Sequence, residues 1–242
     1  MNHTYIIEEI INKGANMDYE KFYYIAEIVG TVAFASSGTL VAIRKGMDIF
    51  GIVVLAIITA VGGGIIRDIT LGITPPMAFR DTTYTSVSIV TALVLIVFLS
   101  KKIKILSLKG VDREFMIKYT QFASVLDAIG LGIFTASAVT VGIARGYMNN
   151  PFLLIFVGVI TGCGGGVMRD LLSDTIPIIF TKNTIYAVAS LLGAVVFIVL
   201  RPFGANFAFF IGASATVVIR LLSMKYRWSL PDVSSDLVDG DD

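Results

Sequence analysis

The stretch TAVGGGIIRDITLG, residues 59–72, places three consecutive glycines and an Arg-Asp pair inside an otherwise apolar segment. A second copy, TGCGGGVMRDLLSD, occupies residues 161–174. Glycine is a poor helix former, and a charged side chain inside a bilayer is costly. Because so unfavourable a feature occurs twice, we expect the fold to be organised around it.

The composition around this stretch is that of a membrane protein. Hydrophobic residues make up 55% of the 242 positions and charged residues 15%, and the mean hydropathy is +0.82. A soluble domain carries about a quarter charged residues. We therefore predict an all-α integral membrane protein with membrane lipid as a partner. The net charge of +1 and the lack of a basic stripe argue against a nucleic-acid partner.

Seven apolar stretches are each close to the ~20 residues that span a bilayer. The first is expected to be retained, because polar and acidic residues precede it where a signal peptide has a short basic region. We predict seven transmembrane helices over residues 23–43, 49–67, 84–100, 120–142, 152–170, 184–200 and 204–223.

The basic residues predict the orientation in the membrane. The loop of residues 100–118 contains six Lys or Arg, and such loops stay in the cytoplasm. The acidic N-terminal tail then faces outside and the C-terminus is cytoplasmic. We expect this arrangement in the inner (plasma) membrane of the cell.

The two copies of the glycine stretch belong to a duplication. Overlaying the halves pairs Glu27 with Asp127, Ser37 with Ser137 and Tyr84 with Tyr186. Each copy holds three spans, so the copies cross the membrane in opposite directions and form an inverted repeat. The predicted parts are a tail (1–21), a first repeat (22–100), a basic loop (101–118), a second repeat (119–201), a seventh helix (202–224) and a tail (225–242).

The glycine triplets have two interpretations. They break the second and fifth helices and free backbone carbonyls to bind a cation, or they let helices approach closely. We favour the break, because the triplets are adjacent, doubled and each followed by charges. The predicted ion-pathway residues are Gly62, Gly63, Gly64, Gly164, Gly165 and Gly166.

The Arg-Asp pairs are expected to neutralise one another at membrane depth. Neighbours on a helix point about 100° apart, so we expect Arg67 to pair with Asp170 and Arg169 with Asp68. Alternatively, the pairs anchor helix ends near the membrane interface.

Other polar residues in the spans are further candidates. Glu27 and Asp127 are candidate pore-mouth acids that attract cations, or solvated residues at helix ends. The hydroxyls of Ser37 and Ser137 either line a wet path or bond back to their own helix, as serines do.

Enzymatic and metal chemistry find little support. Cys163 stands alone between glycines and His3 is the only histidine, so no disulfide, metal cluster or histidine-based triad is available. We expect no enzyme activity, no cofactor and no metal beyond transient K⁺ or Na⁺.

GTVAFASSGTLVAIRKGMDIFGIVVLAIITAVGGGIIRD (residues 30–68) and the partner TGCGGGVMRD (161–170) resemble the bacterial relatives of the trimeric intracellular cation channels. This family is also labelled a glycine-transporter domain. The resemblance covers roughly residues 22–223. It implies seven helices, a homotrimer and an hourglass pore in each protomer, with main-chain groups of the glycine triplets binding ions and water.

Three functions remain open on these grounds. The favoured one is a monovalent cation channel, chiefly for potassium. The alternative is a secondary transporter of glycine or another small amino acid, which the same repeat architecture would suit. A purely structural membrane protein would explain the glycines but not the doubled charges.

Overall fold

The structure, a computed structural model, describes residues 17–107, 113–181 and 185–229. His3, most of both predicted tails and the centre of the basic loop lie outside these ranges, so the orientation stays a prediction. The main helices are α2 (Met17–Arg44), α3 (Ile49–Thr70), α5 (Thr83–Ser107), α6 (Arg113–Ala144), α7 (Pro151–Leu172), α8 (Ala187–Leu200) and α9 (Ala205–Tyr226). Short helical turns between them are α4 (Met77–Arg80), η1 (Tyr147–Asn149), η2 (Ile178–Phe180) and η3 (Arg201–Phe203).

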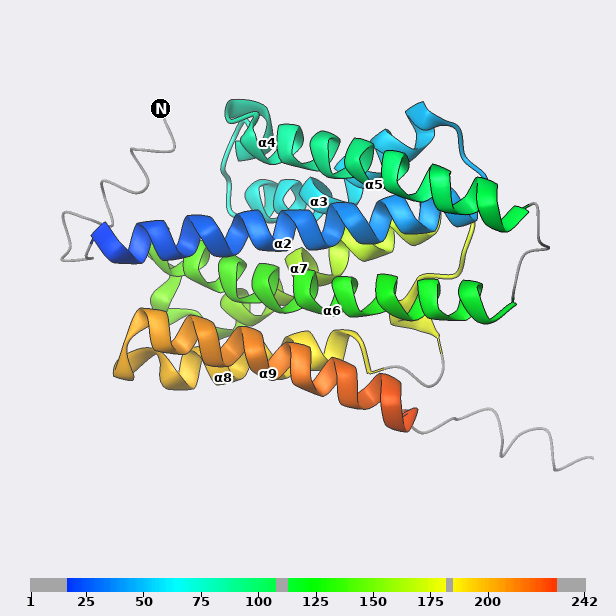
Figure 1. The fold of residues 1–242 in the computed structure, drawn as a ribbon. Helices are drawn as coiled ribbons and strands as arrows, with labels where there is room; N and C mark the ends of the chain where they lie inside the picture. Colours follow the sequence, from blue (N-terminus) through cyan, green and yellow to red (C-terminus); the bar gives the residue numbers. More distant parts are fainter. Residues whose placement is uncertain (1–16, 108–112, 182–184, 230–242) are drawn as a thin grey trace, which may run out of the picture.

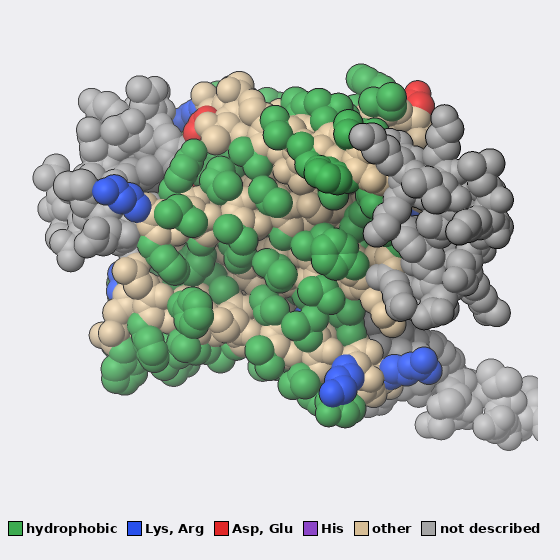
Figure 2. Space-filling view, viewed as in Figure 1, with side chains coloured by type: hydrophobic (Ala, Val, Ile, Leu, Met, Phe, Trp, Pro, Cys, Tyr) green, Lys and Arg blue, Asp and Glu red, His purple; other side chains and the backbone are tan. Residues whose placement is uncertain are grey.

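Within the described ranges, five helices are long and apolar enough to cross a membrane: α2, α3, α6, α7 and α9. Two shorter apolar helices cover Thr83–Leu99 and Ala187–Phe203. Large apolar side chains spread over the outer surface in Figure 2, and Phe50 and Phe152 are 77% and 80% exposed. Broad apolar surface of this kind is typical of contact with lipid. The predicted all-helical membrane protein is confirmed.

The two repeats begin their central helices in the same way. Asp48 caps α3 by accepting a hydrogen bond from the Gly51 amide at 2.7 Å, and Asn150 caps α7 by accepting one from the Leu153 amide at 3.1 Å. Such caps satisfy amides that have no partner inside the helix. The duplicated sequence therefore builds the same helix start twice.

The two halves run in opposite directions. Helices α2 and α6 lie side by side and antiparallel in Figure 1, and α3 packs against α7. Thus α2, α3 and α5 of the first half correspond to α6, α7 and α8 of the second. Helix α9 stands outside the repeat and packs on α6 and α8.

The predicted helix breaks are absent from this structure. Both α3 and α7 are continuous α-helices through their glycine triplets. The reason is steric, because the triplets lie where these two helices cross. A Cβ on Gly63 would lie 2.1 Å from the Thr161 carbonyl oxygen, and one on Gly165 would lie 2.1 Å from that of Thr59. Here the glycines allow close helix packing, which corrects the favoured interpretation of the sequence.

Candidate functional site

The helix crossing lies beside an apolar centre. Phe34 of α2 and Phe134 of α6 stack there with ring centroids 5.3 Å apart. Both rings are buried, at 1% and 7% exposure. A Cβ built on Gly165 would lie 3.6 Å from the Phe34 ring, which places the aromatic pair against the crossing of α3 and α7. The centre of the molecule is therefore filled by apolar and backbone atoms.

A polar cluster on one side of this centre is built around the Glu27 carboxylate. Its Oε1 accepts hydrogen bonds from the Tyr23 hydroxyl at 2.8 Å and the Ser137 hydroxyl at 2.6 Å. Its Oε2 accepts one from the Tyr84 hydroxyl. These donors come from α2, α6 and α5, so both repeats contribute. Both oxygens of this buried carboxylate are occupied.

The Arg-Asp pair of the first repeat completes this cluster. Arg67 Nε donates to Asp68 Oδ1 at 2.8 Å, and Arg67 Nη1 lies 3.8 Å from Glu27 Oε1. The second oxygen of Asp68 accepts from the Met77 amide at 2.7 Å and so fastens the chain that follows α3. We call these residues the first half-site: Tyr23, Glu27, Arg67, Asp68, Tyr84 and Ser137.

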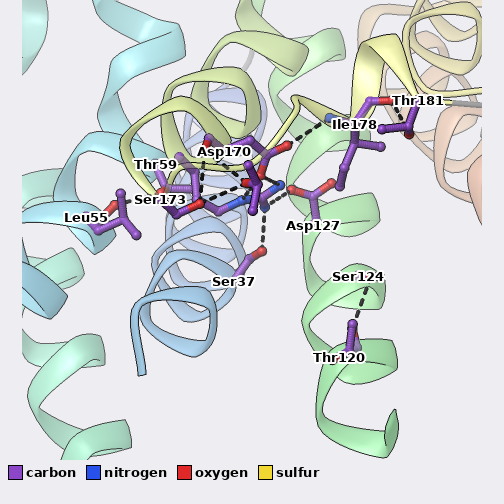
Figure 3. Close-up of polar contacts among 12 residues, drawn as sticks. Ser37, Leu55, Thr59, Thr120, Ser124, Asp127, Asp170, Ser173, Ile178 and Thr181 are labelled. Atoms are coloured by element: carbon purple, nitrogen blue, oxygen red, sulfur yellow. Dashed lines mark hydrogen bonds and ion pairs between the residues drawn. The ribbon is translucent and has the colours of Figure 1, made fainter. Parts of the chain in front are cut away.

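An equivalent cluster lies on the other side of the centre, and Figure 3 shows Ser37, Asp127 and Asp170 gathered there. Arg169 Nη1 donates to Asp127 Oδ1 and, at 2.7 Å, to the Ser37 hydroxyl. Its Nε donates to Asp170 Oδ1 at 2.9 Å, and Asp170 Oδ2 accepts from the Ile178 amide at 2.9 Å. Tyr186 lies beside them, because a Cβ built on Gly166 would lie 2.6 Å from the Tyr186 hydroxyl and 3.5 Å from Asp127 Oδ1. We call this cluster the second half-site: Ser37, Asp127, Arg169, Asp170 and Tyr186.

The arrangement corrects two predictions about the charges. Each arginine pairs with the aspartate beside it in the sequence and with the acid from its own repeat, not across the pseudo-twofold axis. A long guanidinium reaches over the roughly 100° between neighbouring side chains. Glu27 and Asp127 are 5% and 1% exposed, so neither is a solvated residue at a helix end.

Among the residues that the structure describes, neither predicted serine hydroxyl bonds back to its own helix. Ser37 and Ser137 reach across to the half-sites of the opposite repeat. Thr39 and Thr140 instead bond back to carbonyls of their own helices, at 2.8 and 3.0 Å. Since Glu27 and Ser37 are ten residues apart on α2, the two half-sites are separated by about 15 Å along the helix.

A cavity of about 230 Å³ leads to the second half-site. It begins beside Arg44 and Ile176, which are exposed, and it reaches the buried Asp127 carboxylate. Hydroxyls line the path between these ends, from Ser37, Thr120, Ser124 and Thr175. Such a lining suits a hydrated ion or other small polar species.

Sequence reasoning missed several residues of these clusters. Tyr84 and Tyr186 were aligned by the duplication, which was the available signal, and Tyr23 gave none. Arg220 of α9 is 2% exposed and lies beside Tyr186, its guanidinium carbon 4.9 Å from the ring centroid. A charged residue within an apolar span is a signal for function, and it could have drawn attention to Arg220.

The fold and the clusters define an inverted-repeat membrane protein with buried ion pairs, an architecture of channels and transporters. A family model described as "Glycine transporter" matches residues 24–100 and 124–202, one segment in each repeat. The chain is 36% identical over 210 residues to a "UPF0126 membrane protein" of Vibrio cholerae, covering 86% of this chain and 81% of that protein. It is 34% identical over 218 residues to the "UPF0126 inner membrane protein YadS" of Escherichia coli K12, covering 88% and 97%.

Solved structures agree with these relatives. A crystal structure of a prokaryotic TRIC channel in 0.5 M KCl superposes with a TM-score of 0.76 at 31% identity, covering 87% of this chain and 100% of that one. The TRIC orthologue from Rhodobacter sphaeroides gives a TM-score of 0.74 at 32% identity, covering 86% and 99%. The chain belongs to this bacterial TRIC/UPF0126 family of membrane proteins, whose members are channels or transporters and not enzymes.

Proposed function

We propose that the chain is a monovalent cation channel, chiefly for potassium, with an hourglass pathway between the two repeats of each protomer in a homotrimer. One observation carries this proposal: two buried acidic half-sites flank a narrow apolar centre, and a cavity lined in part by hydroxyls reaches one of them. Its structural neighbours are described as cation channels, which supports the same function.

The half-sites suit cations by charge and by ligand. In each of them two carboxylates face one motif arginine, so these three groups together carry a formal charge of −1 before any other residue is counted, and such a charge draws cations inward. Hydroxyls along the cavity replace part of the hydration shell of an entering ion, as oxygen ligands do in selectivity filters. The arginines hold the acids in place at depth through these ion pairs.

Opening must widen the centre. The stacked Phe34 and Phe134 rings and the contact of Gly63 with Gly165 fill the space between the half-sites. Separation or bending of α3 and α7 would clear it. Three glycines make each helix weakest at this crossing, so α3 and α7 deform there at the least cost.

A carrier for glycine is less well supported. The acids beside both glycine triplets are ion-paired with Arg67 and Arg169, which leaves no simple site for an ammonium group there. The name of the family model is the point in favour of a carrier.

The test is flux through purified protein in liposomes. A potassium gradient should drive K⁺ movement that protein-free liposomes lack, and replacing Phe34 and Phe134 together by alanine should increase it. Saturable exchange of labelled glycine without K⁺ flux would overturn the channel. Chemical cross-linking in the same liposomes should trap trimers, and a labelling reagent that does not cross membranes should reach the N-terminal end from outside.

A further inference from the structure

The two half-sites differ by one charge, and the residue responsible is Arg220. Both half-sites contain two acids and one motif arginine, for a formal net charge of −1. Helix α9, which has no counterpart in the repeat, brings Arg220 against Tyr186 of the second half-site. Its charge brings that half-site to zero, while the first stays at −1.

Arg220 is held in place against the Tyr186 ring, with two of its nitrogens unsatisfied in the described part of the chain. One turn further along α9, the Ser223 hydroxyl accepts a hydrogen bond from the Ile185 amide at 2.9 Å, which fixes α9 beside Tyr186. The Nε and Nη1 atoms of Arg220 are buried and make no hydrogen bond within the part of the chain that the structure describes. Groups of this kind call for an explanation beyond packing.

Neighbouring atoms of the second half-site are also unsatisfied. Asp127 Oδ2 and the Tyr186 hydroxyl are buried without a hydrogen-bond partner among the described residues. In the first half-site, the matching carboxylate oxygen of Glu27 accepts from Tyr84. Glutamate is one methylene longer than aspartate, which explains why the carboxylate of Glu27 reaches its tyrosine and that of Asp127 does not. Asp127 lines the cavity, and its buried Oδ2 is an acceptor that a cation could use. Arg220 lies close to this carboxylate by way of Tyr186: its guanidinium stands over the Tyr186 ring, and a Cβ built on Gly166 would lie 2.6 Å from the Tyr186 hydroxyl and 3.5 Å from Asp127 Oδ1.

We propose that Arg220 determines cation occupancy of the second half-site: its fixed charge stands where a second cation would otherwise bind beside Asp127. The inference rests on the proposed cation channel. A cation entering the cavity is attracted by the free Asp127 oxygen and repelled by Arg220, whereas one in the first half-site meets no such repulsion. Occupancy of the two half-sites is therefore unequal, and the pathway conducts more readily in one direction.

The experiment compares Arg220→Gln with two controls at low ionic strength. Arg220→Lys keeps the charge, and Lys225→Gln removes a charge from the exposed end of the same helix. K⁺ binding is measured on detergent-purified protein from the unfolding temperature, with KCl replacing N-methylglucamine chloride. Arg220→Gln should bind K⁺ severalfold more tightly than wild type, and both controls should match wild type. The difference should shrink in 1 M salt, where screening acts within about 3 Å.

Flux in liposomes provides the second measurement. Arg220→Gln should raise K⁺ flux severalfold and reduce its directional asymmetry. Equal K⁺ affinity in wild type and Arg220→Gln, or the same change in Lys225→Gln, would overturn the role of Arg220. Wild-type protein that binds K⁺ with the predicted variant difference but passes none would overturn the channel alone. Arg220→Met, which fills the same space without charge, replaces the glutamine variant if that protein does not fold.

Discussion

The first and second half-sites are built from equivalent residues but differ in how many oxygens of the central carboxylate are hydrogen-bonded. In the first, three hydroxyls occupy both oxygens of Glu27. In the second, one Asp127 oxygen has no hydrogen-bond partner in the described part of the chain, Asp127 lines a cavity, and Arg220 adds a charge from outside the repeat. The duplicated halves therefore hold one cluster whose central carboxylate is fully hydrogen-bonded and one whose carboxylate keeps an unsatisfied oxygen among the described residues, although both clusters are buried. This asymmetry gives the proposed pathway a direction.

The largest effect is expected at the motif arginines, where the two half-sites should behave alike. Replacing Arg169 by methionine leaves two buried carboxylates without their cation, and breaking such a pair costs about 4 kcal/mol. Replacing Arg67 by methionine should cost a similar amount. Unfolding temperature and the yield of monodisperse protein measure both. A mild effect at either position would show that its acids are hydrated and not buried.

Alanine substitutions at the crossing of α3 and α7 should destabilise the protein equally in both repeats. Alanine at Gly63 or at Gly165 drives a methyl group into a backbone carbonyl and should cost about 3 kcal/mol, by overpacking. Alanine at Gly64 is the matched control, because a Cβ there meets nothing nearer than 4.0 Å. Thermal unfolding of the three variants separates close packing from helix propensity. Equal losses at all three positions would contradict the packing role.

Removing the hydroxyl of each cluster tyrosine should affect the stability of the two half-sites differently. Tyr84→Phe removes a hydrogen bond to the Glu27 carboxylate and should lower stability by about 2 kcal/mol. Tyr186→Phe removes a hydroxyl that has no partner among the described residues, so its stability should stay close to wild type. Unfolding temperatures of the two phenylalanine variants provide the comparison. Similar losses in both would mean that the second half-site is as closed as the first.

The smallest effect is expected from adding the hydrogen bond that is missing between residue 127 and the Tyr186 hydroxyl. Asp127→Glu lengthens the carboxylate toward the Tyr186 hydroxyl and should stabilise the protein by about 1 kcal/mol through one added hydrogen bond. The same change should weaken K⁺ binding, because the free oxygen is then occupied. The double variant with Tyr186→Phe should lose the gain in unfolding temperature. A gain that survives in the double variant would have another origin.

The sequence identified buried polar residues of the two clusters better than it predicted their contacts. The internal duplication paired Glu27 with Asp127 and Ser37 with Ser137, and all four residues lie in the half-sites. The pairing of the charges was wrong, because spacing along a helix gives the direction of a Cβ but not the reach of an arginine. The predicted helix break was also wrong for this structure. Glycine weakens a helix, but it also lets a second helix approach closely. Which effect prevails depends on the helix that packs against it, and that helix is distant in the sequence.

By itself, the sequence determined that this is a helical membrane protein built from two copies of one unit. The lengths of the apolar stretches and the internal duplication can be recognised along the chain itself, without knowing which residues contact one another. Only the tertiary structure decided which atoms meet: that α2 supplies Ser37 to the opposite half-site, and that Phe34 stacks on Phe134. It also decided that Arg220 faces Tyr186, since α9 lies outside the repeat and no internal symmetry predicts where it packs.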